Sequence, residues 1–188
     1  MTSQHPQSVS LLGVIRTLNQ LQKDGVIGEW AIFGSVAYSL WTEPVTTGDV
    51  DVLIPVENDL EYARQLSAVA RVGSGFAASG FGVQLHGTRV ELLPSTMSQL
   101  YADALHNAAK HTIRGETVRL VTPPYLVVMA LAAWRSDSTR GVYDEQRARR
   151  LFMLTTRETV ERLVESYADR TPGVTPQQLR ERFARILA

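Results

Sequence analysis

At 188 residues, the chain is long enough for one compact domain, or for a small α/β domain with a helical extension. Hydrophobic residues make up 44% of it, too many for a disordered chain, and the absence of cysteine excludes disulfides and thiolate metal sites. The 19 basic and 19 acidic residues balance, which argues against broad, non-specific nucleic-acid binding. The longest apolar run, residues 125–134, is too short to span a membrane and no apolar leader opens the chain, so we expect a cytoplasmic protein without a membrane partner.

The spacing of apolar residues predicts strands interleaved with helices up to residue 121, followed by helices alone. In chain order we expect a helix, a strand, a helix, a strand and a helix over residues 11–21, 30–33, 35–41, 49–54 and 58–72. A glycine-rich loop then leads to two strands, a helix and a small hairpin over residues 83–85, 88–93, 94–110 and 114–116. Threonines at cap positions predict three or four C-terminal helices, beginning after Thr122, Thr155 and Thr175. This order favours an α/β or α+β core over residues 1–121 and a helical region over residues 122–188.

Two aspartates dominate the strand predicted over residues 49–54. Asp49 and Asp51 are two residues apart, so both carboxylates point to one face while Val50 and Val52 enter the core. Neighbouring carboxylates repel each other unless a cation lies between them. Magnesium prefers oxygen ligands and binds through one or two carboxylates plus substrate phosphates. The pair therefore predicts a magnesium site, and the alternative is an exposed edge strand with alternating acids.

Two further features strengthen the prediction of a site. Gly34-Ser35 ends an apolar strand and begins a helix, so that backbone N–H groups and the serine hydroxyl are available to a phosphate. The alternative there is an ordinary glycine turn with a serine cap. Glu91 lies in an otherwise apolar strand, where a carboxylate needs a partner or a metal. The alternative for Glu91 is an acid at the rim of the sheet, or one paired with Arg89.

Together these residues resemble the DNA polymerase beta-type nucleotidyltransferase superfamily. Its signature is an apolar strand, Gly-Ser and, after a short stretch, Asp-x-Asp between apolar residues. AIFGSVAYSLWTEPVTTGDVDVLIPV matches it, with thirteen residues between Ser35 and Asp49, and HGTRVELLP matches the later strand with its third carboxylate, Glu91. The likeness is best over residues 30–94 and continues weakly through TPPYLVVMALAAWR, which is similar to the bacterial AbiEii-like toxin-type branch.

The resemblance implies an α+β fold, with a mixed sheet flanked by helices and a C-terminal helical bundle. It also implies a magnesium-dependent transfer of a nucleoside monophosphate from a nucleoside triphosphate to a hydroxyl of RNA, such as the 3′ end of a transfer RNA, or of a protein. Asp49 and Asp51 would bind two Mg²⁺ ions, and Glu91 would bind the catalytic one and act as general base. We expect substrate-binding roles for Gly34, Ser35, Thr47, Arg135 and Arg140.

The sequence departs from the toxin-type branch at Val45, Ala130 and Gly141, where that branch has an arginine, a lysine and an aspartate. Magnesium alone does not neutralise the negative charge of a triphosphate in the transition state, so basic side chains are needed as well. We expect this positive charge to come from Lys110, Arg114, Arg135 or Arg140. Arginine-rich helices over residues 135–162 would dock the acceptor; a solvated surface of mixed charge is the alternative. The alternative function is a catalytically degenerate binding or interaction protein, such as one member of a toxin–antitoxin pair with an antitoxin-type partner.

Overall fold

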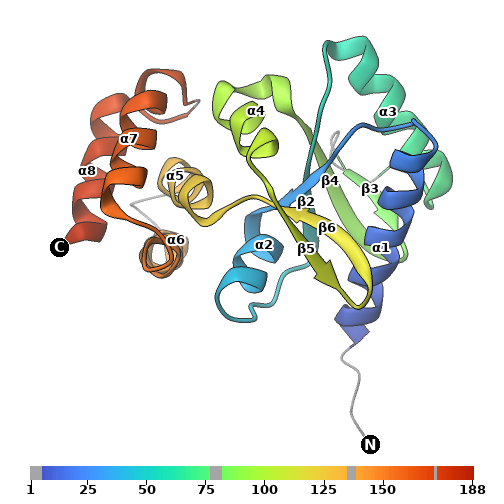
Figure 1. Ribbon diagram of the computed structural model, residues 1–188, viewed down its shortest axis with the longest axis horizontal. Coiled ribbons are helices and arrows are strands. Elements are labelled where there is room, and N and C mark those ends of the chain that lie inside the picture. The colour runs from blue at the N-terminus through green and yellow to red at the C-terminus, as the bar shows by residue number, and fades with distance from the viewer. Residues whose placement is uncertain (1–5, 77–81, 135–138, 172) are drawn as a thin grey trace, which may run out of the picture.

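The computed structural model describes residues 6–76, 82–134, 139–171 and 173–188. Within these ranges, a six-stranded mixed sheet is flanked by helices, and the C-terminal helices lie together at one side of it (Figure 1). The predicted α+β fold with a mixed sheet is therefore confirmed. In the part of the chain that the structure describes, no helix is both long and apolar enough to cross a bilayer.

The first half of the chain alternates helices and strands as expected. Its elements are α1 (Pro6–Lys23), β1 (Ala31–Phe33), α2 (Gly34–Trp41), β2 (Asp49–Ile54) and α3 (Asp59–Val72). Val14, Ile15 and Leu18 are fully buried on the inner face of α1, and Gly25 closes the turn after this helix with a φ of +69°. Asn58 caps α3, because its side chain accepts a hydrogen bond from a backbone N–H in the first turn.

The next segment forms two hairpins with one helix between them. Its elements are β3 (Gly82–Leu85), β4 (Thr88–Pro94), the 3-10 turn η1 (Ser95–Met97), α4 (Gln99–His106), β5 (Ala109–Ile113) and β6 (Glu116–Leu120). The helix predicted over residues 94–110 is wrong at both ends. Ser98 caps α4, so the helix begins only after the 3-10 turn, and Asn107 ends it. The residues that follow pair in β5, because Arg114 and Gly115 adopt positive φ angles and form a tight turn.

Strand order places β2 inside the sheet. The order is β3-β4-β2-β1-β6-β5, with β2 antiparallel to β1 and parallel to β4. Val50, Val52, Leu53 and Ile54 of β2 are all buried. An interior strand with this burial excludes the alternative in which the two aspartates lie on an exposed edge strand.

In the described residues, four α-helices follow the sheet, where the sequence predicts three or four. They are α5 (Pro123–Ala133), α6 (Thr139–Phe152), α7 (Arg157–Tyr167), which ends in the 3-10 turn η2 (Ala168–Arg170), and α8 (Pro176–Leu187). The apolar α5 packs against α6, α7 and α8, while α2 connects this group to the sheet. Thr175 and Gln178 form the expected capping box. The box expected from Thr155 is wrong, because the backbone N–H of Thr155 still bonds to α6 and Thr156 caps α7 instead.

Candidate active site

The parallel pairing of β2 with β4 brings the three predicted acids to one place. In the register of these strands Asp51 is opposite Glu91, and Asp49 is opposite Arg89. Directly paired residues on neighbouring strands point to the same face of a sheet. Asp49, Asp51 and Glu91 therefore share a face, together with one arginine.

The bend between β1 and α2 encloses the Asp51 carboxylate. Gly34 has a φ of +62°, and a Cβ added to it would lie 2.0 Å from the Asp51 Oδ2 atom. The backbone N–H of Ser35 donates a hydrogen bond to the same carboxylate. Only glycine allows this approach, so the Gly34-Ser35 pair holds Asp51 in place, and the phosphate-binding role expected for this pair stays a prediction.

The environment of Asp51 disfavours its negative charge. Burial is the main cause, and the nearby charges of Asp49 and Glu91 add to it, so that the pKa of Asp51 rises to about 7. The Ser35 N–H and the Arg89 guanidinium act in the opposite direction, with smaller effects on this pKa. The site therefore carries more negative charge than its own groups neutralise, which a bound cation would relieve.

Thr47 holds the other aspartate. Its hydroxyl lies 2.8 Å from the Asp49 Oδ1 atom and 3.2 Å from the Asp49 backbone oxygen, and it donates to both acceptors. A carboxylate fixed by a hydroxyl keeps one oxygen oriented and leaves the other available. Thr47 thus positions Asp49, and the substrate-binding role expected for Thr47 stays a prediction.

Glu91 has a partner of its own on the same strand. The Arg89 guanidinium donates to the Glu91 carboxylate in a close ion pair. Within the described ranges, no group of three or more acids or histidines has the placement of a metal-binding set. Asp49 and Asp51 alone nevertheless fit magnesium, which needs only one or two carboxylates when substrate phosphates complete its shell. The participation of Glu91 in metal binding stays a prediction.

A cation that the sequence did not single out contacts the bend. Arg147 of α6 donates from Nη1 to the Ser35 hydroxyl at 3.2 Å, and its guanidinium carbon lies 5.6 Å from the centre of the Tyr38 ring. Arg135, expected to bind substrate, lies outside the described residues, and for Arg140 only the backbone in α6 is described. Helical spacing places Arg147 on one face of α6, but only the packing of α6 against α2 directs that face to Ser35.

The other two expected cations lie elsewhere. Lys110 is on β5 and Arg114 in the turn after it, at the sheet edge three strands away from β2, or about 14 Å. Several arginines of the predicted docking face are already paired: Arg149 with Glu145, and Arg157 with Glu161. For these residues, the alternative of a mixed-charge helix surface describes the structure better.

A pocket of about 550 Å³ lies beside the bend. It is formed by α2, by the loop before β2 and by α6, and its lining residues are Tyr38, Glu43, Val45, Thr46, Tyr143, Gln146, Arg147 and Arg150. Arg150 and Glu43 form a close ion pair, so Arg147 is left as the cation of this pocket that contacts Ser35. Two tyrosine rings and this guanidinium suit a ligand with a flat, apolar part and a negative charge.

The fold and the carboxylate-bearing strands together define a nucleotidyltransferase-like fold. Similar solved structures include an antigenic nucleotidyltransferase-like protein from Paracoccidioides brasiliensis, with a TM-score of 0.63 and 18% identity over 96% of this chain and 88% of that one. The antibiotic-resistance factor ANT(2″)-Ia in solution has a TM-score of 0.55 and 15% identity over 96% of both chains. Its crystal structure with adenylyl-2″-tobramycin has a TM-score of 0.51 and 13% identity over 95% of this chain and 99% of that one.

At these identities the likeness is one of fold. A comparison with protein-family models finds no match, and no curated protein is significantly similar in sequence. The resemblance to the AbiEii-like branch therefore stays a prediction, as do the roles of the individual site residues.

Proposed function

We propose that this protein is a magnesium-dependent nucleotidyltransferase that moves a nucleoside monophosphate from a nucleoside triphosphate to a hydroxyl of RNA or protein. The observation that carries the proposal is the enclosure of Asp51 by the Gly34-Ser35 bend, with Asp49 beside it and Glu91 opposite it in the register. The nucleotidyltransferase-like fold supports it.

The chemistry of each side chain indicates its proposed role. Asp49 and Asp51 would hold magnesium, which when bound would neutralise phosphate charge. The Ser35 hydroxyl and the Arg147 guanidinium, which already contact each other, would bind phosphate oxygens. Arg147 would then supply the charge that Val45 and Ala130 cannot.

The transfer replaces a phosphoanhydride bond of the triphosphate with a phosphate ester bond to the acceptor. The acceptor hydroxyl oxygen forms a bond to the α-phosphorus, while the bond from that phosphorus to the oxygen bridging the β-phosphate breaks. Pyrophosphate leaves with the electron pair. Glu91 is the base proposed for the acceptor proton, and for this it would exchange its ion pair with Arg89 for a contact with substrate.

The ion pair of Glu91 favours a second candidate function. A site whose third acid is already neutralised by Arg89 suits a protein that binds a nucleotide without turnover, or that serves as one member of a toxin–antitoxin pair. The two functions differ in one observable, which is covalent transfer.

Transfer is tested with each α-labelled nucleoside triphosphate, magnesium, and total RNA, a protein extract or tobramycin as acceptor. Tobramycin is included because one of the similar structures is ANT(2″)-Ia in complex with adenylyl-2″-tobramycin. We expect label on RNA or protein, and we expect Asp49→Asn to abolish it with a melting temperature unchanged or raised, because repulsion between the carboxylates falls. Asp24→Asn, at an exposed position after α1, is the matched control and should retain full transfer.

Two results would reject the first function. Binding of the triphosphate without label on any acceptor favours the degenerate protein, and full transfer by Asp49→Asn removes the aspartates from catalysis. Label on tobramycin alone would retain the reaction and correct the acceptor.

Arg147→Met should weaken binding of the magnesium triphosphate by about 10-fold to 100-fold, because a charged hydrogen bond is worth roughly 1.5–3 kcal/mol. Calorimetry measures the dissociation constant. Arg157→Met removes the same charge from a pair on α7 and serves as the control, with binding unchanged. Equal affinities of Arg147→Met and the wild type would show that Arg147 does not bind phosphate.

A further inference from the structure

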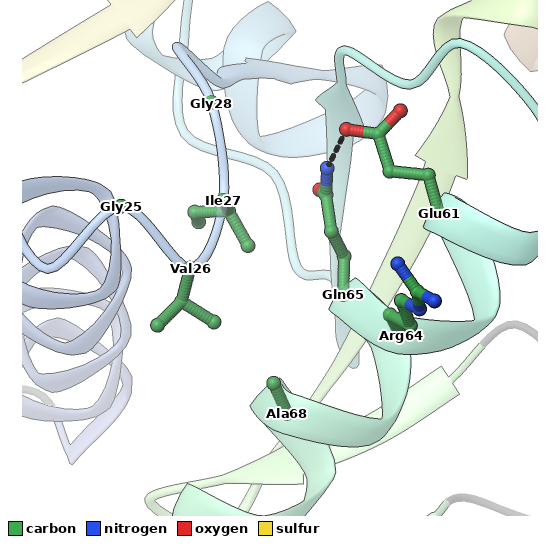
Figure 2. A pocket seen from close by; sticks show the side chains of 8 residues that line it. All are labelled: Gly25, Val26, Ile27, Gly28, Glu61, Arg64, Gln65 and Ala68. Atoms are coloured by element: carbon green, nitrogen blue, oxygen red, sulfur yellow. Dashed lines mark hydrogen bonds between the residues drawn. The ribbon is translucent and has the colours of Figure 1, made fainter.

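A second pocket lies at the other end of β2. It is an open pocket with a volume of about 580 Å³, and it is lined by the turn of residues 25–28, which follows α1, and by one face of α3 (Figure 2). Glu61, Arg64, Gln65 and Ala68 form that face, because residues three and four apart are neighbours on a helix. Gln65 of the pocket donates to the backbone oxygen of Pro55, which is four residues after Asp51, or about 13 Å along the strand. It shares no residue with the candidate active site.

Gln65 presents an unused acceptor in this pocket. The side chain is only 6% exposed, and its Nε2 donates to the Pro55 backbone oxygen at 3.1 Å and to the Glu61 Oε1 atom at 3.0 Å. Both partners are acceptors only, so the amide cannot be flipped, and Oε1 must face the other way. Oε1 is buried without a hydrogen-bond partner. Figure 2 shows the Gln65 amide between Glu61 and the 25–28 turn.

A buried acceptor without a donor costs roughly 1–3 kcal/mol, and a ligand that brings an N–H group would remove that cost. The Glu61 carboxylate, next to the Gln65 amide, makes a positively charged donor preferable to a neutral one. Because Oε1 is buried, binding such a ligand requires the lining side chains to move and expose it.

The other side chains of the pocket indicate which further groups a ligand would need. Val26, Ile27 and Ala68 give the pocket an apolar side, and Figure 2 shows the first two across from α3. Arg64 is exposed at the rim and offers a guanidinium to an anion. An ammonium donor, a carboxylate and a short alkyl chain in one small molecule are the features of an aliphatic α-amino acid.

We propose that this pocket binds a free aliphatic α-amino acid, whose ammonium group donates to Gln65 Oε1 beside Glu61, whose carboxylate pairs with Arg64 and whose alkyl chain contacts Val26, Ile27 and Ala68. The observation that carries the proposal is the combination, in one pocket, of a fixed, unsatisfied amide oxygen, an acid and a base on α3 with an apolar wall that the 25–28 turn completes.

The test uses free leucine as the probe and the ¹⁵N-labelled full chain. We expect saturable shifts, below about 10 mM leucine, in the backbone amides of residues 25–28 and in the side-chain amide of Gln65. N-acetyl-leucine lacks the ammonium and leucinamide lacks the carboxylate, so each should bind about tenfold more weakly or worse. Arg64→Met should reduce leucine affinity and leave leucinamide affinity unchanged.

Ala68→Leu provides a variant that fills the pocket without changing charge. It should abolish the leucine shifts while the melting temperature stays the same or rises, since an added alkyl group covers apolar surface. Leucine shifts that do not saturate, that fall outside residues 25–28 and α3, or that survive Ala68→Leu would each overturn the proposal. Equal binding of N-acetyl-leucine would also overturn it, because the positive charge of the ammonium group would then have no part in recognition.

Discussion

Asp51→Asn is expected to stabilise the metal-free protein at pH 8 by about 2–4 kcal/mol and to abolish nucleotide transfer. The stabilising effect follows from the pKa of Asp51, which burial and the charges of Asp49 and Glu91 raise from 3.8 to about 7. Each pH unit between the two values corresponds to 1.36 kcal/mol, so keeping this carboxylate ionised in the folded protein costs up to about 4 kcal/mol. Asparagine is neutral, and its side-chain oxygen still accepts the Ser35 N–H.

The sign of the pH dependence follows from proton binding. Below about pH 4, Asp51 is protonated in both the folded and the unfolded chain, and it contributes no difference. Between about pH 4 and 7, the unfolded chain releases this proton while the folded protein retains it, so the free energy of unfolding falls as the pH rises. The stability gain of Asp51→Asn over the wild type should therefore be small at pH 4.5 and largest at pH 8.

Urea denaturation of both proteins in EDTA, at pH 4.5, 6 and 8, measures this gain directly. Asp24→Asn, at an exposed position, should show no such trend and serves as the control. A pH-independent difference between Asp51→Asn and the wild type would contradict the raised pKa. Magnesium provides a separate readout. At about a hundred times its dissociation constant it should stabilise the wild type by about 2.7 kcal/mol, and Asp51→Asn by much less.

Gly34→Ala is expected to lower the free energy of unfolding by about 2–5 kcal/mol and to remove transfer. Alanine at a φ of +62° costs about 1–2 kcal/mol, because its Cβ is crowded in the left-handed region. The new Cβ would also lie 2.0 Å from the Asp51 Oδ2 atom, and overpacking of this kind costs about 1–3 kcal/mol more. Relief of the contact moves Asp51, which disturbs the proposed metal pair.

Gly25→Ala separates the two costs. Gly25 has a similar φ of +69°, but a Cβ there would meet nothing within 4 Å, so this variant should lose only about 1–2 kcal/mol. In an Asp51→Ala background, the cost of Gly34→Ala should fall towards that of Gly25→Ala, because the Asp51 carboxylate is gone. Equal losses for Gly34→Ala and Gly25→Ala in the wild-type background would show that the contact with Asp51 has no energetic weight.

Local features of the site could be predicted because they depend on near neighbours in the chain. Asp49 and Asp51 share a face since side chains on a strand alternate, and β2 has the predicted bounds. The Gly34-Ser35 bend follows from an apolar strand that meets a helix at a glycine. The helix expected over residues 94–110 is wrong because Pro94 precedes a 3-10 turn and Ser98 caps the α-helix, while the turn at Arg114 and Gly115 pairs the residues after the helix in a hairpin.

Contacts between distant segments could not be predicted in the same way. Glu91 lies opposite Asp51 because Val50 and Val52 of β2 pair with Val90 and Leu92 of β4, and all four side chains are buried. Its ion pair with Arg89 was one of two open alternatives, and the sequence did not decide between them.

The sequence by itself determined the strands, most of the helices and the two acids on β2, because these depend on periodicity and turn chemistry within a few residues. Only the tertiary structure decided that Arg147, more than a hundred residues after Ser35, supplies the cation at the bend, and that the Gln65 amide faces the turn after α1. The physical reason is that packing of helices against the sheet selects which face of each helix is turned inward. That selection minimises exposed apolar area over the whole molecule and is not encoded at any single position.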